Sequence, residues 1–148
     1  MKSYVDELKE ARDSAQEVIK KIDKALALLK RSKGFGRWDV VGGGKFVSYF
    51  KRRNIKKSRK AIKDVEAAMK KLNRELKDAD LFIPDGPSHT MFDNILDIFL
   101  DNVFIDLSVQ KEINKNIKFM KSLRKKVIRT QNQLKLKIRT EEIKKVVS

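Results

Sequence analysis

Apolar residues recur at alternating spacings of three and four along the first part of the chain. This is the spacing of a coiled-coil seam, in which Arg12 fills one position. Ser3 is placed to cap a first turn that carries two acidic residues, and Gly34 and Gly36 are expected to end the helix. The pattern predicts a helix over residues 3–33. The seam consists of Val5, Leu8, Ala15, Ile19, Ile22, Leu26 and Leu29.

A second segment repeats this spacing and predicts a helix over residues 46–80. An aromatic stretch forms its first turns, and the sequence Pro84-Asp85-Gly86-Pro87 places a turn over residues 81–88. The seam of this helix consists of Ile55, Ser58, Ile62, Val65, Met69, Leu72, Leu76 and Ala79.

The third segment predicts a helix over residues 89–146, because neither proline nor glycine interrupts it. Such a helix would be nearly 90 Å long, at about 1.5 Å per residue, and its neighbours could not cover it. We expect it either to break near residues 108–116 or to overhang and pair with another chain. The overhang favours a homo-oligomer, with a dimer as the expected form. Its later seam consists of Ile113, Ile117, Met120, Val127, Leu134 and Ile138, with Arg124 and Gln131 within it.

Composition supports an elongated protein. Of the 148 residues 38% are charged, against about a quarter in typical soluble proteins. Long helices provide the large solvent-exposed surface that so many charged side chains need. The predicted fold is all-α: an elongated antiparallel helical bundle or coiled coil of three long helices, the third broken or overhanging. Residues 1–148 form a single unit, with a glycine-rich junction over residues 34–45.

Other compositional features narrow the function. The chain has no cysteine, which excludes disulfides, thiolate metal sites and cysteine nucleophiles. Its N-terminus lacks the apolar core of a signal peptide, and no apolar run approaches the roughly 18 residues of a membrane span, so we expect a cytoplasmic protein.

The net charge of +16 is unevenly distributed. Residues 45–77 hold 13 basic and 3 acidic side chains, residues 78–110 hold 7 acidic and no basic ones, and residues 111–148 again hold 13 and 3. We interpret the excess first as the solvated face of long helices, partly neutralised by pairing between them. The candidate polyanion-binding residues are Lys51, Arg52, Arg53, Lys56, Lys57, Lys121, Arg124, Lys125, Lys126 and Arg129.

Two polyanions fit these basic clusters. A nucleic acid is one, because phosphate neutralisation needs several cations on one surface. An anionic membrane surface is the other, because aromatic residues beside Lys51-Arg52-Arg53 resemble an interfacial anchor. Those aromatic residues are Trp38, Phe46, Tyr49 and Phe50.

The segment Trp38-Asp39-Val40-Val41-Gly42-Gly43-Gly44-Lys45 does not match either glycine-rich nucleotide motif. The dinucleotide fingerprint requires a glycine where Val47 stands, and the phosphate loop requires a serine or threonine where Phe46 stands. We interpret the segment as a close-packed connection between helices, or as a surface that brings backbone against a partner, with Trp38 as an anchor.

Nothing in the sequence assembles an active site. His89 is the single histidine, and Asp93, Asp97 and Asp101 repeat every four residues as an acidic helix face, which is more often solvated or salt-bridged than a Mg²⁺ site. No nucleophile, base and orienting group stand at a suitable spacing. We therefore expect no enzyme activity, catalytic residues, cofactor, metal or small-molecule substrate.

The junction and the later segment Phe104-Ile105-Asp106-Leu107-Ser108-Val109-Gln110 with Ile113 together resemble an uncharacterised family of bacterial, Firmicute-type helical coiled-coil proteins. The resemblance implies a cytoplasmic protein with no assigned activity and adds no catalytic residues.

It also suggests that the glycine-rich junction packs against the Phe104–Gln110 segment, where junction N–H groups would satisfy two polar side chains. The candidate junction or partner-binding residues are Trp38, Asp39, Gly42, Gly43, Gly44, Phe46, Phe104, Asp106 and Gln110. The function predicted from the sequence is a non-enzymatic scaffold or protein-interaction module, with a nucleic-acid-binding module or a membrane-surface protein as alternatives.

Overall fold

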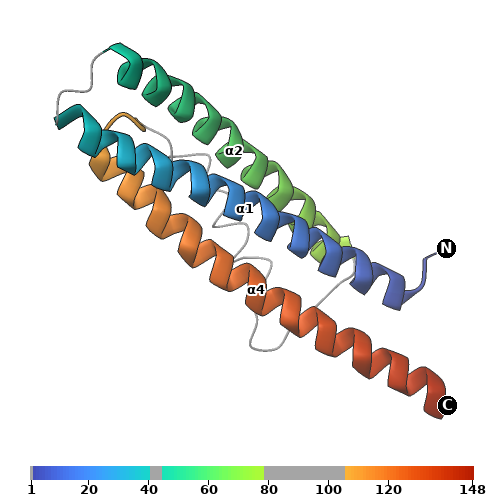
Figure 1. Cartoon of the computed structure of the whole chain (residues 1–148). Coiled ribbons are helices and arrows are strands. Elements are labelled where there is room, and N and C mark those ends of the chain that lie inside the picture. Colours follow the sequence, from blue (N-terminus) through green and yellow to red (C-terminus); the bar gives the residue numbers. More distant parts are fainter. Residues whose placement is uncertain (1, 41–44, 79–105) are drawn as a thin grey trace.

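The computed structural model describes residues 2–40, 45–78 and 106–148, and within these ranges the chain is all-α (Figure 1). Its helices are α1 (Tyr4–Val40), α2 (Lys45–Asp78) and α4 (Gln110–Val147). Their 37, 34 and 38 residues give lengths of roughly 55, 50 and 57 Å at about 1.5 Å per residue. The predicted all-α bundle of long helices is confirmed.

Helix α1 lies at the centre, with α2 and α4 packed against it; in the described chain the backbones of α2 and α4 do not approach each other closely (Figure 1). The start of α2 meets the end of α1, where the Asn54 side-chain amide donates to the Leu28 carbonyl oxygen at 2.9 Å. The end of α4 meets the start of α1, where Lys9 and Glu142 form an ion pair at 3.1 Å. Both outer helices therefore run antiparallel to α1 and parallel to each other.

The expected helix over residues 89–146 is wrong at residues 106–109, where the chain is not helical. The Asp106 carboxylate accepts hydrogen bonds from the Ser108 backbone N–H at 2.9 Å and from the Ser108 hydroxyl. Such a local turn competes with the helical hydrogen-bond ladder. Val109 is extended, with φ −94° and ψ 123°, and α4 begins directly after it. The break lies at the start of the predicted window.

The direction of the last helix also differs from the one we expected. We expected it to run back along the second helix, but α4 starts at the same end of the bundle as α2 (Figure 1). There is no long overhang either, because α4 stays paired with α1 as far as Glu142. The homo-oligomer stays a prediction, without the overhang that first favoured it.

The end of the first helix is a second correction. We expected Gly34 and Gly36 to end it, yet α1 continues through both to Val40. A glycine inside a helix costs only about 0.5–1 kcal/mol relative to alanine, which is too little to end a helix without a proline or a capping motif. The predicted junction over residues 34–45 therefore loses its first seven residues to α1.

The predicted seam of α1 is buried, and a second stripe is buried beside it. Because α1 contacts two helices, it needs a wider buried face than a two-stranded coiled coil. The added positions carry mostly small side chains, which a search for large apolar residues overlooks. They are Ala11, Ser14, Val18, Ala25 and Ser32.

The seams of the outer helices are also confirmed over the described residues. In α2 the seam is buried from Ser58 to Leu76, while Ile55 is half-buried and Ala79 lies outside the described chain. In α4 the six predicted apolar residues are buried, and Leu123 and Thr130 join them. In the described part of the chain, no helix is long and apolar enough to cross a membrane.

A polar cluster lies inside the interface between α1 and α2. The Asn54 side chain donates to Ser32 Oγ as well as to the Leu28 carbonyl oxygen, and the Ser58 hydroxyl donates to the Asn54 carbonyl oxygen at 2.8 Å. Asn54, Ser32 and Ser58 are all buried. A one-residue slip between the helices would leave these groups without partners, so the cluster fixes the register that places the first turns of α2.

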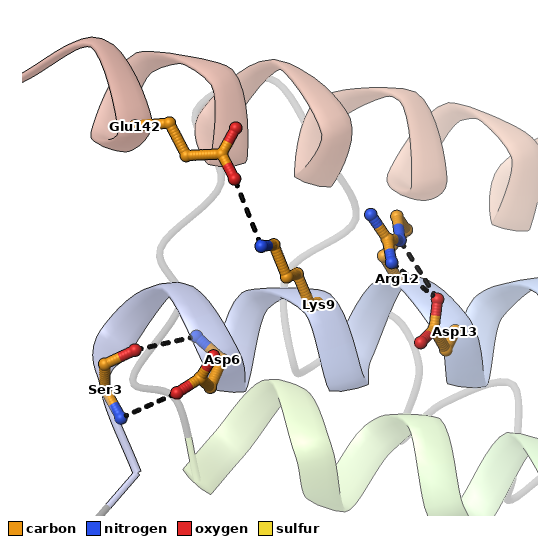
Figure 2. A network of polar contacts seen from close by, with 6 residues as sticks. All are labelled: Ser3, Asp6, Lys9, Arg12, Asp13 and Glu142. Atoms are coloured by element: carbon orange, nitrogen blue, oxygen red, sulfur yellow. Dashed lines mark hydrogen bonds and ion pairs between the residues drawn. The ribbon is translucent and has the colours of Figure 1, made fainter. Parts of the chain in front are cut away.

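The N-terminus of α1 carries the predicted serine cap (Figure 2). The Ser3 hydroxyl accepts from the Asp6 N–H at 3.2 Å, and the Asp6 carboxylate accepts from the Ser3 N–H at 3.3 Å. These reciprocal bonds form a capping box with aspartate in the usual place of glutamate. The pKa of Asp6 is lowered, first by the Ser3 hydroxyl near its carboxylate and then by the Ser3 backbone N–H.

Candidate functional site

The first half of α2 carries a hollow of about 910 Å³ on its exposed side. Four of the predicted polyanion-binding residues line it, and the other described lining residues extend the basic cluster. Its described lining consists of Tyr49, Arg52, Arg53, Lys56, Lys57, Arg59, Lys60 and Lys63. Arg52, Lys56, Arg59 and Lys63 follow the helical spacing of four, three and four, so they form one row about 16 Å long.

A second, smaller hollow of about 210 Å³ continues this surface toward α1. It is lined by Arg31 of α1 and by Phe50, Arg53, Asn54 and Lys57 of α2. The two hollows share Arg53 and Lys57, so they form one continuous surface. We name this surface the basic track, and it comprises the eight cations Arg31, Arg52, Arg53, Lys56, Lys57, Arg59, Lys60 and Lys63 with Tyr49 and Phe50.

The cations of the basic track are exposed, and within the described residues none of the eight forms an ion pair. Elsewhere basic residues do pair with acidic ones, as Lys70 does with Glu66 at 3.2 Å and Lys21 with Glu17 at 3.6 Å. From the sequence we expect part of this positive charge to be neutralised by ion pairs between helices. Within the described chain the basic track shows no such pairing, but most of the acidic block over residues 78–110 lies outside the described residues, so the interpretation stays a prediction.

The turn at Asp106 lies within electrostatic range of this surface. The pKa of Asp106 is lowered, first by the Ser108 hydroxyl and backbone N–H and then, more weakly, by the positive charge of Arg59. We had expected junction N–H groups to satisfy Asp106, but its hydrogen bonds come from Ser108 in its own turn. Gln110, the first residue of α4, is exposed and needs no buried partner.

The α4 residues of the predicted polyanion site lie apart from the basic track. Arg124 pairs with Asp23 of α1, with its Nε 2.7 Å from the Asp23 carboxylate, so it helps to hold the bundle together. Lys126 is half-buried, whereas Lys121, Lys125 and Arg129 are exposed on α4. Lys51 of α2 is also half-buried and lines neither hollow.

The candidate residues of the glycine-rich junction are only partly placed. Trp38 and Asp39 belong to the last turns of α1 and Phe46 to the first turn of α2, while their side chains lie outside the described part. Gly42, Gly43, Gly44 and Phe104 lie outside the described residues. The predicted contact between the junction and the Phe104–Gln110 segment therefore stays a prediction.

The sequence pointed to the α2 cluster but did not single out all of the track. The same sequence cluster contains Arg59 and Lys60, and Tyr49 stands beside it, whereas Lys63 was not singled out. The spacing of four, three and four from Arg52 would have found Lys63. Arg31 could not be found in this way, because only the packing of α1 on α2 brings it to Arg53 and Lys57.

The described residues offer no obvious place for a metal: within them no three histidine or acidic side chains gather as ligands would. His89 and the three aspartates of the acidic face lie outside the described chain.

Comparison with known proteins gives no match to a family model, to a curated protein or to a solved structure. The resemblance to a bacterial helical family stays a prediction.

Proposed function

We propose that this protein is a non-enzymatic helical scaffold whose basic track binds the phosphate backbone of a nucleic acid. The observation that carries the proposal is the set of eight exposed cations, none of them in an ion pair within the described chain, along one hollowed surface. Concentrated, unneutralised positive charge is what phosphate binding and counterion release require.

The shape of the basic track favours a nucleic acid over a membrane surface. A helix that binds a bilayer needs an apolar face turned toward the lipid, but the apolar face of α2 is buried against α1, with Ile62, Val65 and Met69 inaccessible. Among the described side chains of this surface two exposed aromatic rings remain, Tyr49 and Phe50, among cations that line hollows. A flat bilayer does not enter a hollow, whereas a nucleic-acid strand does.

The proposal is tested by removing charge from the row on α2. Substitution of Arg52, Lys56, Arg59 and Lys63 by glutamine keeps the side chains long and polar. We expect this variant to bind a fluorescein-labelled 20-nucleotide strand at least about tenfold more weakly in fluorescence anisotropy, because each lost phosphate contact weakens binding.

The matched control removes four exposed cations from α4, by substituting glutamine for Lys118, Lys121, Lys125 and Arg129. Its net charge equals that of the α2 variant. If the row on α2 forms the site, the control binds within about threefold of wild type. If both variants bound the strand equally weakly, the proposal would be contradicted, because binding would then depend on net charge and not on the row on α2.

A second candidate function, self-association or protein binding, has its own observation. Leu136, Ile143 and Val147 are 63%, 56% and 81% exposed on α4. Their spacing of seven and four places them on one helix face, opposite the buried stripe that contains Leu134 and Ile138. An exposed apolar row on a helix is a usual contact surface for another helix, so we propose this face for the predicted homo-oligomer.

A further inference from the structure

We infer that Tyr49 is a stacking platform for a nucleic-acid base, so that the basic track prefers single strands to duplexes. The inference rests on the proposed function, since cations must first hold the strand. It begins from the unusual exposure of two neighbouring aromatic residues, Tyr49 at 61% and Phe50 at 49%. Within the described residues neither ring belongs to the core of the bundle.

The two rings support each other. Their centroids are 5.6 Å apart and their planes are inclined by 74°, which is an edge-to-face pair. In such a pair the face of only one ring is occupied by its neighbour, so ring faces stay accessible. The contact also limits the freedom of the Tyr49 side chain, which reduces the entropy that a ligand must overcome on binding.

The position of Tyr49 selects it over Phe50 as the main platform. Tyr49 lines the larger hollow together with seven cations, whereas Phe50 lines the smaller hollow with Arg31, Arg53 and Lys57. A strand whose phosphates follow the row on α2 can thus place a base beside Tyr49 without leaving the cations. Aromatic side chains interleaved with positive charge are the usual way in which proteins hold single strands without reading their sequence.

The preference for single strands follows from where bases present their faces. In a duplex the base faces are covered by their neighbours, so a surface aromatic ring gains nothing from them. In a single strand a base can unstack onto Tyr49, and such a contact changes affinity by roughly 5- to 150-fold. Phosphate contacts are available in both forms, so they do not account for the preference.

The test compares three 12-nucleotide ligands: a single strand with bases, an abasic single strand with the same phosphates, and a duplex. We expect wild type to bind the base-bearing strand about tenfold or more tightly than the abasic one. We expect Tyr49→Ala to remove this difference while leaving affinity for the abasic strand unchanged. Tyr49→Trp should retain it, and circular dichroism should show the same helix content in all variants.

Equal binding of base-bearing and abasic strands by wild type would overturn the inference while leaving phosphate binding intact. The inference would also be overturned if Tyr49→Ala lowered the affinity for both strands equally, because the ring would then support the structure of the site and not contact a base. If wild type binds none of the three ligands, the proposed function fails as well. Binding to vesicles of phosphatidylserine and phosphatidylcholine that depends on Tyr49, without binding to any strand, would assign the track to a membrane instead.

Discussion

Gly34 shows how weakly a single residue acts on a long helix. It lies inside α1, it is exposed, and an added Cβ would meet nothing within 4 Å. Read by itself the glycine predicted the end of the helix, but its intrinsic cost is small beside the packing that holds α1 between two helices.

We predict that Gly34→Ala stabilises the protein by about 0.5–1 kcal/mol, because alanine loses less backbone freedom on folding and has space for its methyl group. Urea unfolding followed by circular dichroism measures the change. A destabilised variant would show that the backbone at Gly34 is not helical in solution.

The capping box at the N-terminus of α1 gives a pH-dependent prediction. The pKa of Asp6 in the folded protein is lowered from its ordinary value of 3.8. A lowered pKa means that Asp6 stabilises the fold fully above that ordinary value, and that the contribution is lost as the pH falls through the folded-state pKa. Asp6→Asn should therefore be less stable than wild type at neutral pH, and the difference should disappear at low pH.

The measurement is the free energy of unfolding of both proteins by urea, at pH 7 and at a series of pH values below 3.8, over which the Asp6 carboxylate takes up its proton. Other carboxylates titrate equally in both proteins and cancel in the difference. A difference that stays constant over this range would show that the charge of Asp6 does not contribute to the cap.

At the scale of the helices, period and spacing were enough to predict the helical segments and their buried seams. They did not reveal the second buried stripe of α1, because its alanines and serines look like surface residues until a second helix covers them. Nor did they predict where α4 starts. That position depends on the Asp106 carboxylate, which accepts a hydrogen bond from the Ser108 N–H in a turn that competes with helical backbone hydrogen bonds.

The exposed face of α4 carries the prediction that belongs to this scale. We expect wild type to show a concentration-dependent mass in sedimentation equilibrium, and the double variant Leu136→Gln/Ile143→Gln to associate roughly 100-fold or more weakly. Each buried aliphatic side chain contributes about 1.5–3 kcal/mol, and a symmetric interface counts each twice. A wild-type protein that stays monomeric at all concentrations would remove this face as a self-association surface.

For the molecule as a whole, the sequence predicted where the basic residues are but not what they do. Net charge and clusters suggested that the charge was solvated or paired between helices. Only the folded arrangement brings Arg31 next to the α2 cations. Within the described residues, Arg124 forms an ion pair with Asp23, whereas the cations of the basic track form none. Pairing depends on which helix faces meet, and helix periodicity does not determine that.

The salt dependence of nucleic-acid binding tests the central claim most directly. If the row from Arg52 to Lys63 neutralises four phosphates, log K for a single strand should fall against log salt with a slope of about −3, or roughly 50-fold between 50 and 200 mM salt. The variant with glutamine at all four positions of the row should show a clearly shallower slope, because only the four other cations of the basic track remain to contact phosphates. A wild-type slope shallower than about −1, or the same slope in wild type and variant, would contradict the account.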